Sequence, residues 1–517
     1  MPVFSARSAL LANLLSGLAL SLAVPASAAT FTVTSTANSG PGSLREAIAA
    51  ANATIGNVHS VVFELPADSR IVLQSELPPI EKPIFSINGS GSARLLITDR
   101  TPSPSSIDYD APLLRVASTN TLLTLTDLSL FSGRRVGGGG CLLANPPSGN
   151  NATVVLTRVN VEGCSGVRNT LFGSAYGGGV LVFGRSVNIN GGRFEGNGFE
   201  NQPPGNFRVG GAALAVFADS GQQVVIQGAY FGENPAIGGT VDSGFAAAGG
   251  AIYVEGGARL SINRSQFLEN VAGAAAGNRS SGSAIHTDGN LLLENSLFFE
   301  GNSARGLVVA TAEDRTRTLN IRNTTFFRGI AEGSGNSLIY SDYAEVLVRN
   351  STFAESALSP TSASEIRVEA RAGQIGPSVL RLSNSLFGSG SSAGAACSVG
   401  ANVGVETSFN LSNRPAPGCG ITSTPASLRL DDFPDIPPSG EGGFLALLLD
   451  SPAVDAGNFA LPSIGDWRTC MTTDARGVAR PQNGTGHPVL FACDIGAYEQ
   501  EPARLFRNGF EPVISMR

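Results

Sequence analysis

The sequence is poor in charge, and above all in lysine. Charged residues make up 15% of its 517 residues, Lys82 is its one lysine, and its formal net charge is −7. The basic residues form no cluster, so the chain lacks the positive patch with which proteins hold the phosphates of nucleic acids. We therefore expect no nucleic-acid partner.

Several short motifs of known catalytic and cofactor sites are also missing. The sequence has no Walker motif, no H-E-x-x-H and no repeated GGxGxDx calcium motif, each of which carries a specific metal or phosphate chemistry. The paired-aspartate and vicinal-histidine motifs of pectin-cleaving hydrolases are absent as well. We expect neither a cofactor nor a metal ion.

Long apolar runs are confined to the N-terminus. Arg7 precedes an apolar run from Ala9 to Val24, which leads to the small-residue sequence Ala26-Ser27-Ala28. This pattern is typical of a secretory signal peptide cleaved after Ala28. The alternative is a membrane anchor, but Ser16 and the Ala-x-Ala end do not suit one. We expect an exported chain with no membrane-spanning segment after the signal peptide is removed.

A short phrase is repeated nine times in the central part of the chain. Two aliphatic residues, separated by one residue, are followed by four mostly polar residues and one large apolar residue. Successive large apolar residues lie 27 to 37 residues apart, a period that indicates one supersecondary unit per repeat, stacked on its neighbours. The phrases are Leu123/Leu125/Leu130, Val154/Leu156/Val161, Val187/Ile189/Phe194, Val224/Ile226/Phe231, Leu260/Ile262/Phe267, Leu291/Leu293/Phe298, Leu319/Ile321/Phe326, Val346/Val348/Phe353 and Leu380/Leu382/Phe387.

The alternation inside each phrase predicts β-strands rather than helices. A second predicted strand precedes most phrases and opens on glycine, as at Gly177, Gly210, Gly249 and Gly282. Glycine and asparagine tolerate the left-handed backbone of tight corners, so such strands can wind into a coil. We predict an all-β fold, a right-handed parallel β-helix solenoid of roughly a dozen coils, each rising about 4.8 Å, in which Ile/Leu, Phe and Asn form ladders. The predicted Asn ladder comprises Asn197, Asn234, Asn270 and Asn302.

The alternation of "GGA[ILV]" with "FxxN" over about residues 120–390 resembles the repeats of polymorphic outer-membrane proteins. That resemblance implies a β-helical passenger region, secreted or on the cell surface of a Gram-negative bacterium, with a role in adhesion.

Six cysteines fall into three local pairs along the chain. An exported protein can hold them as disulfides, although six cysteines allow 15 pairings. Zinc binding is disfavoured, because there is no C-x-x-C spacing and no nearby histidine. Their separations of 23, 22 and 23 residues are slightly less than one coil, so we predict that each bond ties one coil to the next. The pairs are Cys141–Cys164, Cys397–Cys419 and Cys470–Cys493.

Residues 31–53 are expected to cover the open N-terminal end of the stack. Ser43 and Glu46 form a capping-box pattern, and the helix that follows has Leu44, Ala47, Ile48 and Ala51 on one face. An ordinary surface helix is the alternative, but a solenoid end needs a cover over its unpaired strand edges. The segment resembles the CSLREA domain of exported repeat proteins, with Gly42 where that name has Cys.

The C-terminal region carries a second resemblance. Residues 451–458 (SPAVDAGN), 473–482 (TDARGVARPQ) and 493–499 (CDIGAYE) are similar to the choice-of-anchor Q domain, which implies a closing domain. Asp455, Asp474 and Asp494 could form a metal or acid site, or could accept backbone N–H groups in turns. We divide the chain into a signal peptide (1–28), an N-terminal cap with the first coils (29–120), the repeats (121–392), C-terminal coils with a cap (393–500) and a tail (501–517).

The one candidate catalytic patch lies on two adjacent glycine-led strands. Aligning Gly250 with Ser283 places Tyr253 beside His286 and Glu255 beside Asp288, with Ile252 and Ile285 pointing inward. The four polar side chains are then outward, about 4.8 Å apart along the stack, which is an acid/base or metal-binding constellation in outline. The alternative is a strand that runs into a turn. Elsewhere the same two columns are expected to contain Leu181, Leu214, Val309 and Phe183, Val216, Thr311, on a face partly covered by inserts at 198–209 and 236–248.

Two functional classes remain open. The first, which the sequence favours, is a non-catalytic secreted or cell-surface protein that uses a long flat face for adhesion or for polysaccharide binding. The second is a polysaccharide lyase or glycoside hydrolase acting on the outer face of the same scaffold. A fold by itself does not choose between them. We expect a monomer with a polysaccharide or cell-surface ligand.

Overall fold

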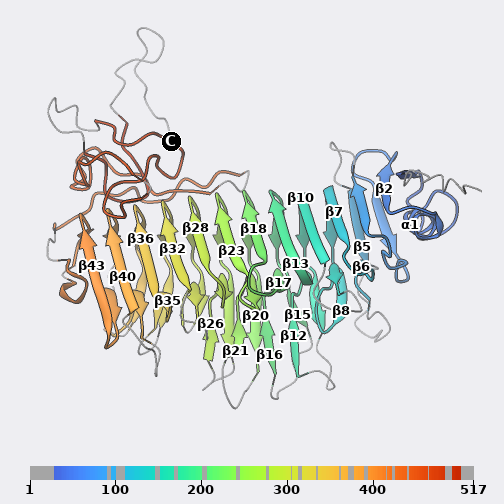
Figure 1. Ribbon diagram of the computed structural model, residues 1–517, viewed down its shortest axis with the longest axis horizontal. Coiled ribbons are helices and arrows are strands. Elements are labelled where there is room, and N and C mark those ends of the chain that lie inside the picture. The colour runs from blue at the N-terminus through green and yellow to red at the C-terminus, as the bar shows by residue number, and fades with distance from the viewer. Residues whose placement is uncertain are drawn as a thin grey trace, which may run out of the picture.

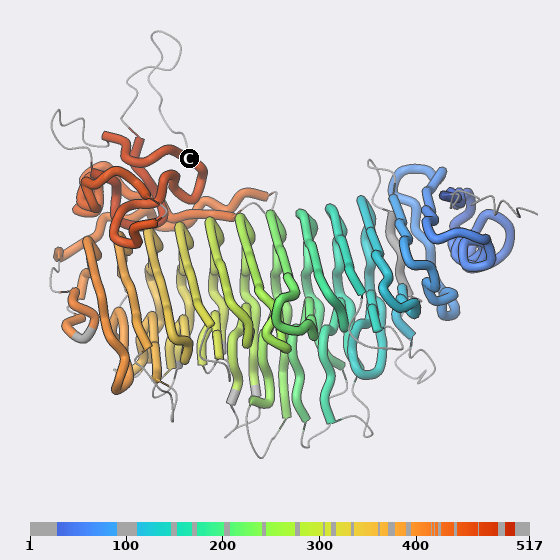
Figure 2. The backbone as a smooth tube through the Cα atoms, viewed as in Figure 1, coloured from blue at the N-terminus to red at the C-terminus, as the bar shows by residue number. Residues whose placement is uncertain are grey.

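The structure is a parallel β-helix. It is a computed structural model, and Figures 1 and 2 show its strands stacked side by side along one elongated body. The predicted signal peptide and C-terminal tail lie almost wholly outside the described residues. The structure describes residues 28–89, 95–99, 111–145, 152–167, 173–200, 207–239, 245–274, 279–303, 305–311, 317–332, 336–359, 362–370, 378–388, 394–414, 416–421, 425–438, 442–463, 465–483 and 492–501.

Sheet 1 runs the length of the stack and contains the two aliphatic residues of every phrase. Each of its strands pairs in parallel with the strand one coil away. Its strands are β1 (Ala29–Val33), β2 (Val58–Phe63), β4 (Ile84–Asn88), β7 (Leu122–Phe131), β10 (Ala152–Glu162), β13 (Val180–Asn190), β18 (Gln223–Gln227), β23 (Arg259–Asn263), β28 (Leu291–Glu294), β32 (Thr318–Arg322), β36 (Glu345–Arg349), β40 (Ser378–Ser383) and β43 (Val403–Ser408).

Sheet 2 contains the large apolar residue of each phrase. Leu130, Val161 and Phe194 are register partners across three coils, and the partnership continues without a break to Phe387. The register of all nine predicted phrases is therefore confirmed. Besides the second halves of β7 and β10, this sheet has β3 (Arg70–Leu73), β5 (Leu95–Asp99), β14 (Arg193–Glu195), β19 (Tyr230–Gly232), β24 (Gln266–Leu268), β29 (Leu297–Phe299), β33 (Thr325–Phe327), β37 (Thr352–Ala354), β41 (Leu386–Gly388) and β44 (Leu411–Ser412).

Two further sheets complete each coil. Sheet 3 consists of two successive groups of paired strands, first β8 (Arg134–Val136), β11 (Ser165–Val167) and β15 (Gly198–Glu200), then β20 (Pro235–Gly238), β25 (Val271–Ala274), β30 (Asn302–Ser303), β34 (Ile330–Glu332) and β38 (Ala357–Ser359). Sheet 4 is glycine-led and contains β6 (Leu114–Val116), β9 (Leu142–Ala144), the start of β13, β17 (Leu214–Phe217), β22 (Ile252–Glu255), β27 (Ile285–Thr287), β31 (Val308–Ala310), β35 (Ser337–Ser341), β39 (Ser364–Val368) and β42 (Ala395–Val399).

The long inserts between these strands form a parallel sheet of their own, here called the insert sheet. Its small core contains Phe207, Val209 and Ala247. The prediction that the insert at 236–248 covers part of the outer face is confirmed, because Phe245 of that insert contacts His286 of sheet 4. Ser281, from the insert that follows, contacts His286 as well. The strands are β12 (Ser174–Tyr176), β16 (Arg208–Gly210), β21 (Phe245–Ala248) and β26 (Arg279–Ser281).

Glycine is required at the corner that opens the sheet 4 strands. The backbone is left-handed at four glycines of this corner, with φ of 61° at Gly177, 62° at Gly211, 61° at Gly249 and 66° at Gly282. Residues other than glycine and asparagine adopt this conformation at a cost. A Cβ atom at Gly249 would also lie 2.1 Å from the carbonyl oxygen of Ile252. The glycines therefore fix where each coil turns.

The predicted asparagine ladder is present over three coils. Asn234 donates from Nδ2 to the carbonyl of Phe194 (2.9 Å) and to Oδ1 of Asn270 (2.9 Å), and its own Oδ1 accepts from the backbone of Asn197 (3.0 Å). The prediction was wrong for Asn302, which is exposed. Phe298, not Phe299, occupies the ladder, so Gly301 falls at the asparagine position and Asn302 comes one residue too late.

The N-terminal helix α1 (Leu44–Ala53) covers the first coil, as expected. Ser43 is its N-cap and accepts from the backbone N–H of Glu46 at 3.2 Å. All four residues of the predicted apolar face are buried, and the helix packs on β1 and β2. Figure 1 places it at the blue end of the stack.

The C-terminal region has two parts, and the first of them lies at the end of the stack. The end of the stack is closed by residues 416–421, where the short 3-10 helix η1 (Pro417–Cys419) and the buried Ile421 join the main core. The later residues, here called the flank segment (425–501), lie instead along the side of the last coils (Figure 2). Leu428, Leu447 and Ile495 pack there on Leu386 and Leu411 of sheet 2.

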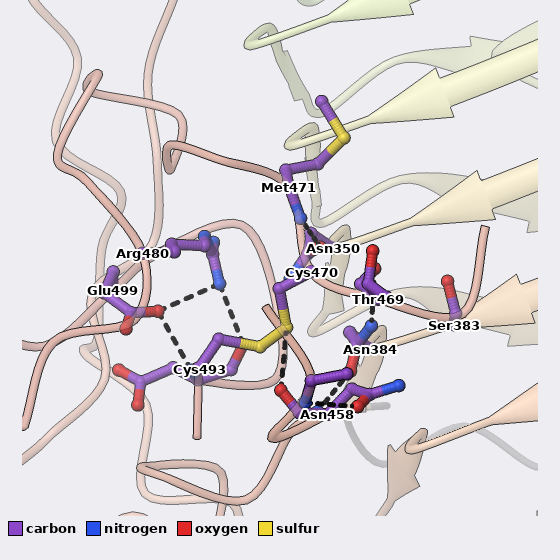
Figure 3. The surroundings of a disulfide bond; sticks show 12 residues. Asn350, Ser383, Asn384, Asn458, Thr469, Cys470, Met471, Arg480, Cys493 and Glu499 are labelled. Atoms are coloured by element: carbon purple, nitrogen blue, oxygen red, sulfur yellow. Dashed lines mark hydrogen bonds and ion pairs between the residues drawn. A yellow bond between two sulfur atoms is a disulfide. The ribbon is translucent and has the colours of Figure 1, made fainter. Parts of the chain in front are cut away.

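A seam of corner asparagines holds the flank segment, as Figure 3 shows for Asn350 and Asn384. Asn384 donates from Nδ2 to the carbonyl of Arg468 at 3.0 Å, and the backbone N–H of Met471 donates to Oδ1 of Asn350 at 2.9 Å. Asparagine was predicted at the corners of the coil, but its role in docking the flank segment was not.

The three predicted disulfide pairs are all formed. Cys141 and Cys164 lie on adjacent coils, and Cys397 of β42 is bonded to Cys419 of the closing turn. Cys470–Cys493 differs from the expectation, because it lies within the flank segment (Figure 3) and joins no two coils. Three disulfides are compatible with an extracellular protein. Separately, no helix among the described residues has the length and apolar character needed to cross a membrane.

Candidate functional site

The four predicted site residues belong to β22 and β27 of sheet 4 and to the turn that follows β27. The predicted register is confirmed, because Tyr253 is the partner of His286 and Ile252 that of Ile285. Ile252 and Ile285 are fully buried in the core. Tyr253 and His286 therefore lie on the outer side of the coil, where their rings stack with centroids 5.4 Å apart.

His286 is not open to solvent, which corrects its expected position on an exposed face. It is buried, because the insert sheet lies over it. Ser281 Oγ of β26 lies 2.8 Å from its Nδ1, and the ring of Phe245 of β21 packs edge-on against it at 5.7 Å. Burial, with a smaller contribution from Arg305, lowers the pKa of His286 to about 4. The imidazole is therefore neutral at physiological pH.

The two carboxylates have different partners. Asp288 accepts the backbone N–H groups of Gly256 and Gly257, at 3.0 Å and 2.9 Å, and so closes the turn after β22. Glu255 is exposed and accepts from the hydroxyl of Tyr253 at 2.8 Å. Burial raises the pKa of Tyr253, so its phenol stays protonated. The site therefore has one solvent-exposed carboxylate, that of Glu255, rather than a pair of carboxylates.

Four aromatic side chains continue this outer face toward the N-terminus. We call Tyr176, Phe183, Phe217 and Tyr253 the aromatic shelf. Phe183 and Phe217 stack with centroids 4.9 Å apart, and Tyr176 packs edge-on against Phe217 at 5.1 Å. Tyr176 also contacts Tyr253 at 5.2 Å. All four are half-buried and pack with Leu143, Leu181 and Ala215, which lie in the same outward column of sheet 4 as Tyr253.

The shelf was not predicted from the sequence, because the expected register on β17 was wrong by one residue. Leu214 and Val216 were expected in the two outer columns, but the partners of Tyr253 and Glu255 are Ala215 and Phe217. A one-residue slip moves every side chain to the opposite face, so the aromatic residue was counted as inward. The extra residue in "GGAALAVF" compared with "GGAIYVE" could have revealed the shift.

Asp474 and Asp494 accept backbone N–H groups in turns, the second of the two alternatives. Asp474 Oδ1 accepts the backbone N–H groups of Arg476 (2.8 Å) and Val478 (2.9 Å), and Asp494 Oδ1 accepts that of Asp455 (2.7 Å). Burial raises the pKa of Asp494 to about 8. Glu499 is buried beside it and pairs with Arg480 at 3.1 Å. Among the described residues, no group of three or more His, Cys, Asp or Glu side chains could hold a metal ion.

Comparisons with known proteins add no assignment. No protein-family model, no curated protein and no solved structure matches the chain. The three resemblances drawn from its motifs therefore stay expectations.

Proposed function

We propose that the protein is a non-catalytic, secreted or cell-surface binding protein that holds a polysaccharide on the aromatic shelf. The observation that carries the proposal is the shelf itself: four half-buried rings in one continuous patch, bordered by the exposed carboxylate of Glu255. Aromatic rings pack on the apolar C–H faces of sugars, and a carboxylate accepts from their hydroxyls. Binding sites commonly combine such an apolar surface with a few polar groups.

The contacts of His286 and Asp288 favour binding over catalysis. Glycan cleavage needs a positioned acid or base that can exchange a proton with the substrate. His286 is buried under the insert sheet, and both oxygens of Asp288 accept backbone N–H groups. The contact of Tyr253 with Glu255 supports the alternative function, a lyase or hydrolase. The test below measures cleavage and so distinguishes the two.

The test measures retention and cleavage together. Purified full-length mature protein is run through native gels that contain single polysaccharides from a neutral, acidic and amino-sugar panel, and each mixture is assayed for new reducing ends and for unsaturated products. We expect slowed migration with at least one polysaccharide, no cleavage, and loss of the shift in Phe217→Ala. Tyr230→Ala is the matched control, since Tyr230 is a half-buried outward aromatic on sheet 2.

Two results would contradict the proposal. Retention that Phe217→Ala and Tyr230→Ala reduce equally would remove the shelf as the binding site. Cleavage by the wild type that Glu255→Gln abolishes, without a change in the unfolding curve, would establish the lyase or hydrolase alternative.

A further inference from the structure

Two outward columns run along sheet 1, register partner on register partner. Over the first eight strands, from β1 to β23, these two columns contain no charged side chain. All but three of their residues carry a hydroxyl or an amide. This surface, here called the neutral face, consists of Thr30, Ser60, Ser86, Thr124, Val155, Asn188, Val225 and Ser261 in one column, and Thr32, Val62, Asn88, Thr126, Thr157, Asn190, Gln227 and Asn263 in the other.

The same two columns change character at β28. Glu294 pairs there with Arg322 at 3.1 Å, and further along Arg381 pairs with Glu406 at 2.9 Å. The flank segment then covers this end, where Ser383 donates from Oγ to the carbonyl of Trp467 at 2.6 Å. The stack therefore divides along one sheet into a charged, partly covered half and a neutral half that the flank segment leaves uncovered.

Charge occurs only at the margins of the neutral face. Asp127 and Arg158 lie at the corner beside it and pair with each other at 2.6 Å. Arg259 is at the first position of β23, outside the two columns. A polyanion would find no row of cations on this face, and a polycation would find no row of carboxylates.

We propose that the neutral face binds the surface of an uncharged, extended polysaccharide. Hydroxyls and amides both donate and accept hydrogen bonds, as sugar hydroxyls do. The neutral face and an uncharged polysaccharide can therefore exchange hydrogen bonds between uncharged groups. Eight strands span about 34 Å at about 4.8 Å per coil, which gives a polymer many repeated contacts. The ligand class is that of the proposed function, but the residues are different.

The test uses the full mature chain and two insoluble neutral polymers, microcrystalline cellulose and chitin. Bound protein is measured after sedimentation as a function of polymer concentration. Asn188 is the position to change, because it is exposed and lies between Val155 and Val225 at the centre of the face. Asn188→Glu places an unpaired charge there, whereas Asn188→Gln keeps an amide. Ile237→Glu adds the same charge on β20, where Ile237 is 38% exposed.

We expect the wild type to bind at least one polymer, with an affinity that Asn188→Glu lowers about tenfold, because the added carboxylate loses its water against a neutral surface. Asn188→Gln and Ile237→Glu should stay within about twofold of the wild type. Binding should also survive a rise in salt from about 0.1 to 1 M, since no ion pairs are involved.

Three results would overturn the proposal: no retention on either polymer, retention that salt abolishes, or equal losses in Asn188→Glu and Ile237→Glu. Phe217→Ala separates the two proposals. If it removes binding to soluble glycans but not to the insoluble polymers, the shelf and the neutral face act independently. If it removes retention on the insoluble polymers and Asn188→Glu does not, the neutral face is not a binding surface and the shelf stands alone.

Discussion

Arg349 of sheet 1 is bound by Thr469 of the flank segment, 120 residues later in the chain. Its Nε donates to the carbonyl of Thr469 at 2.7 Å, and its Nη2 donates to the hydroxyl of Thr469 and to the carbonyl of Ser463, each at 2.9 Å. The side chain is almost fully buried, and burial lowers its pKa to about 10. A single guanidinium thus joins the solenoid to the segment that lies along it.

Replacing Arg349 should loosen the flank segment without unwinding the coils. Arg349→Ala leaves the buried carbonyl of Cys470 without its donor and removes one of two donors from the carbonyl of Thr469, at a cost of about 2–4 kcal/mol in the free energy of unfolding. Limited proteolysis should then release fragments from residues 425–501 earlier than in the wild type. Arg158→Ala, which removes an exposed ion pair with Asp127, should leave the cleavage rate unchanged. Equal acceleration in both variants would contradict the anchoring role.

The asparagine ladder offers a comparison within one motif. Asn234→Ala removes two donated hydrogen bonds and leaves the backbone N–H of Asn197 without its acceptor inside the fold. We expect a loss of about 2–4 kcal/mol, measured by denaturant unfolding. Asn302→Ala changes the asparagine of a nearly identical "FEGN" sequence, but that residue is exposed, so its midpoint should stay near that of the wild type. A similar loss in both variants would mean that Asn302 belongs to the ladder after all.

The phenylalanine ladder should be the most sensitive part of the core. Phe267 is buried and stacks on Phe231 at 5.1 Å and on Phe298 at 4.6 Å. Phe267→Ala opens a cavity between two rings and should cost roughly 3–5 kcal/mol. Leu292→Ala, an outward and half-buried position on β28, should cost much less. Because the shelf partly buries Tyr253, Tyr253→Ala should fall between the two. The melting temperatures of the three variants test this order. Equal shifts in all three would mean that the register is wrong.

His286 should make the fold acid-sensitive. Its pKa is about 4 in the folded chain and about 6.5 when unfolded, so the unfolded state binds the proton more readily. The contribution of neutral His286 to the free energy of unfolding is complete above about pH 6.5 and is lost as the pH falls toward 4. The loss is about 2–3 kcal/mol between pH 7 and 4.5. Between pH 7 and 4.5, the free energy of unfolding of His286→Gln should fall by about 2–3 kcal/mol less than that of the wild type. Parallel curves for wild type and variant in urea unfolding at the two pH values would show that His286 does not take up this proton.

Local patterns in the sequence predicted most of the scaffold. A phrase such as Leu260/Ile262/Phe267 has an unambiguous inward face, and repetition of the phrase fixes which residues stack. Ser43, Leu44 and Ile48 likewise specify a capped helix with one apolar face, and the burial of that face follows. These predictions succeeded because strand alternation and helix capping depend on neighbouring residues alone.

The candidate site was predicted less well, because its properties depend on covering elements. The pairing of Tyr253 with His286 followed from aligned glycines, yet the burial of His286 comes from Ser281 and Phe245 of the inserts. Val216, rather than Phe217, was expected in the outer column beside Glu255, because the predicted register was off by one residue. Strand periodicity states which side of a coil a residue faces, but not what lies over that side.

The sequence by itself determined the coil, its corners and its ladders, since each coil repeats the same alternation and the same left-handed turns. Only the tertiary structure decided where the chain goes after the last coil. Arg349 is the last residue of β36, and Asn350 and Asn384 are ordinary corner residues of the repeat pattern. Their role appears when Thr469 and Met471 come to lie against them. The physical reason is that hydrogen bonds between residues more than 80 positions apart leave no periodic signal, whereas the stacking of identical units does.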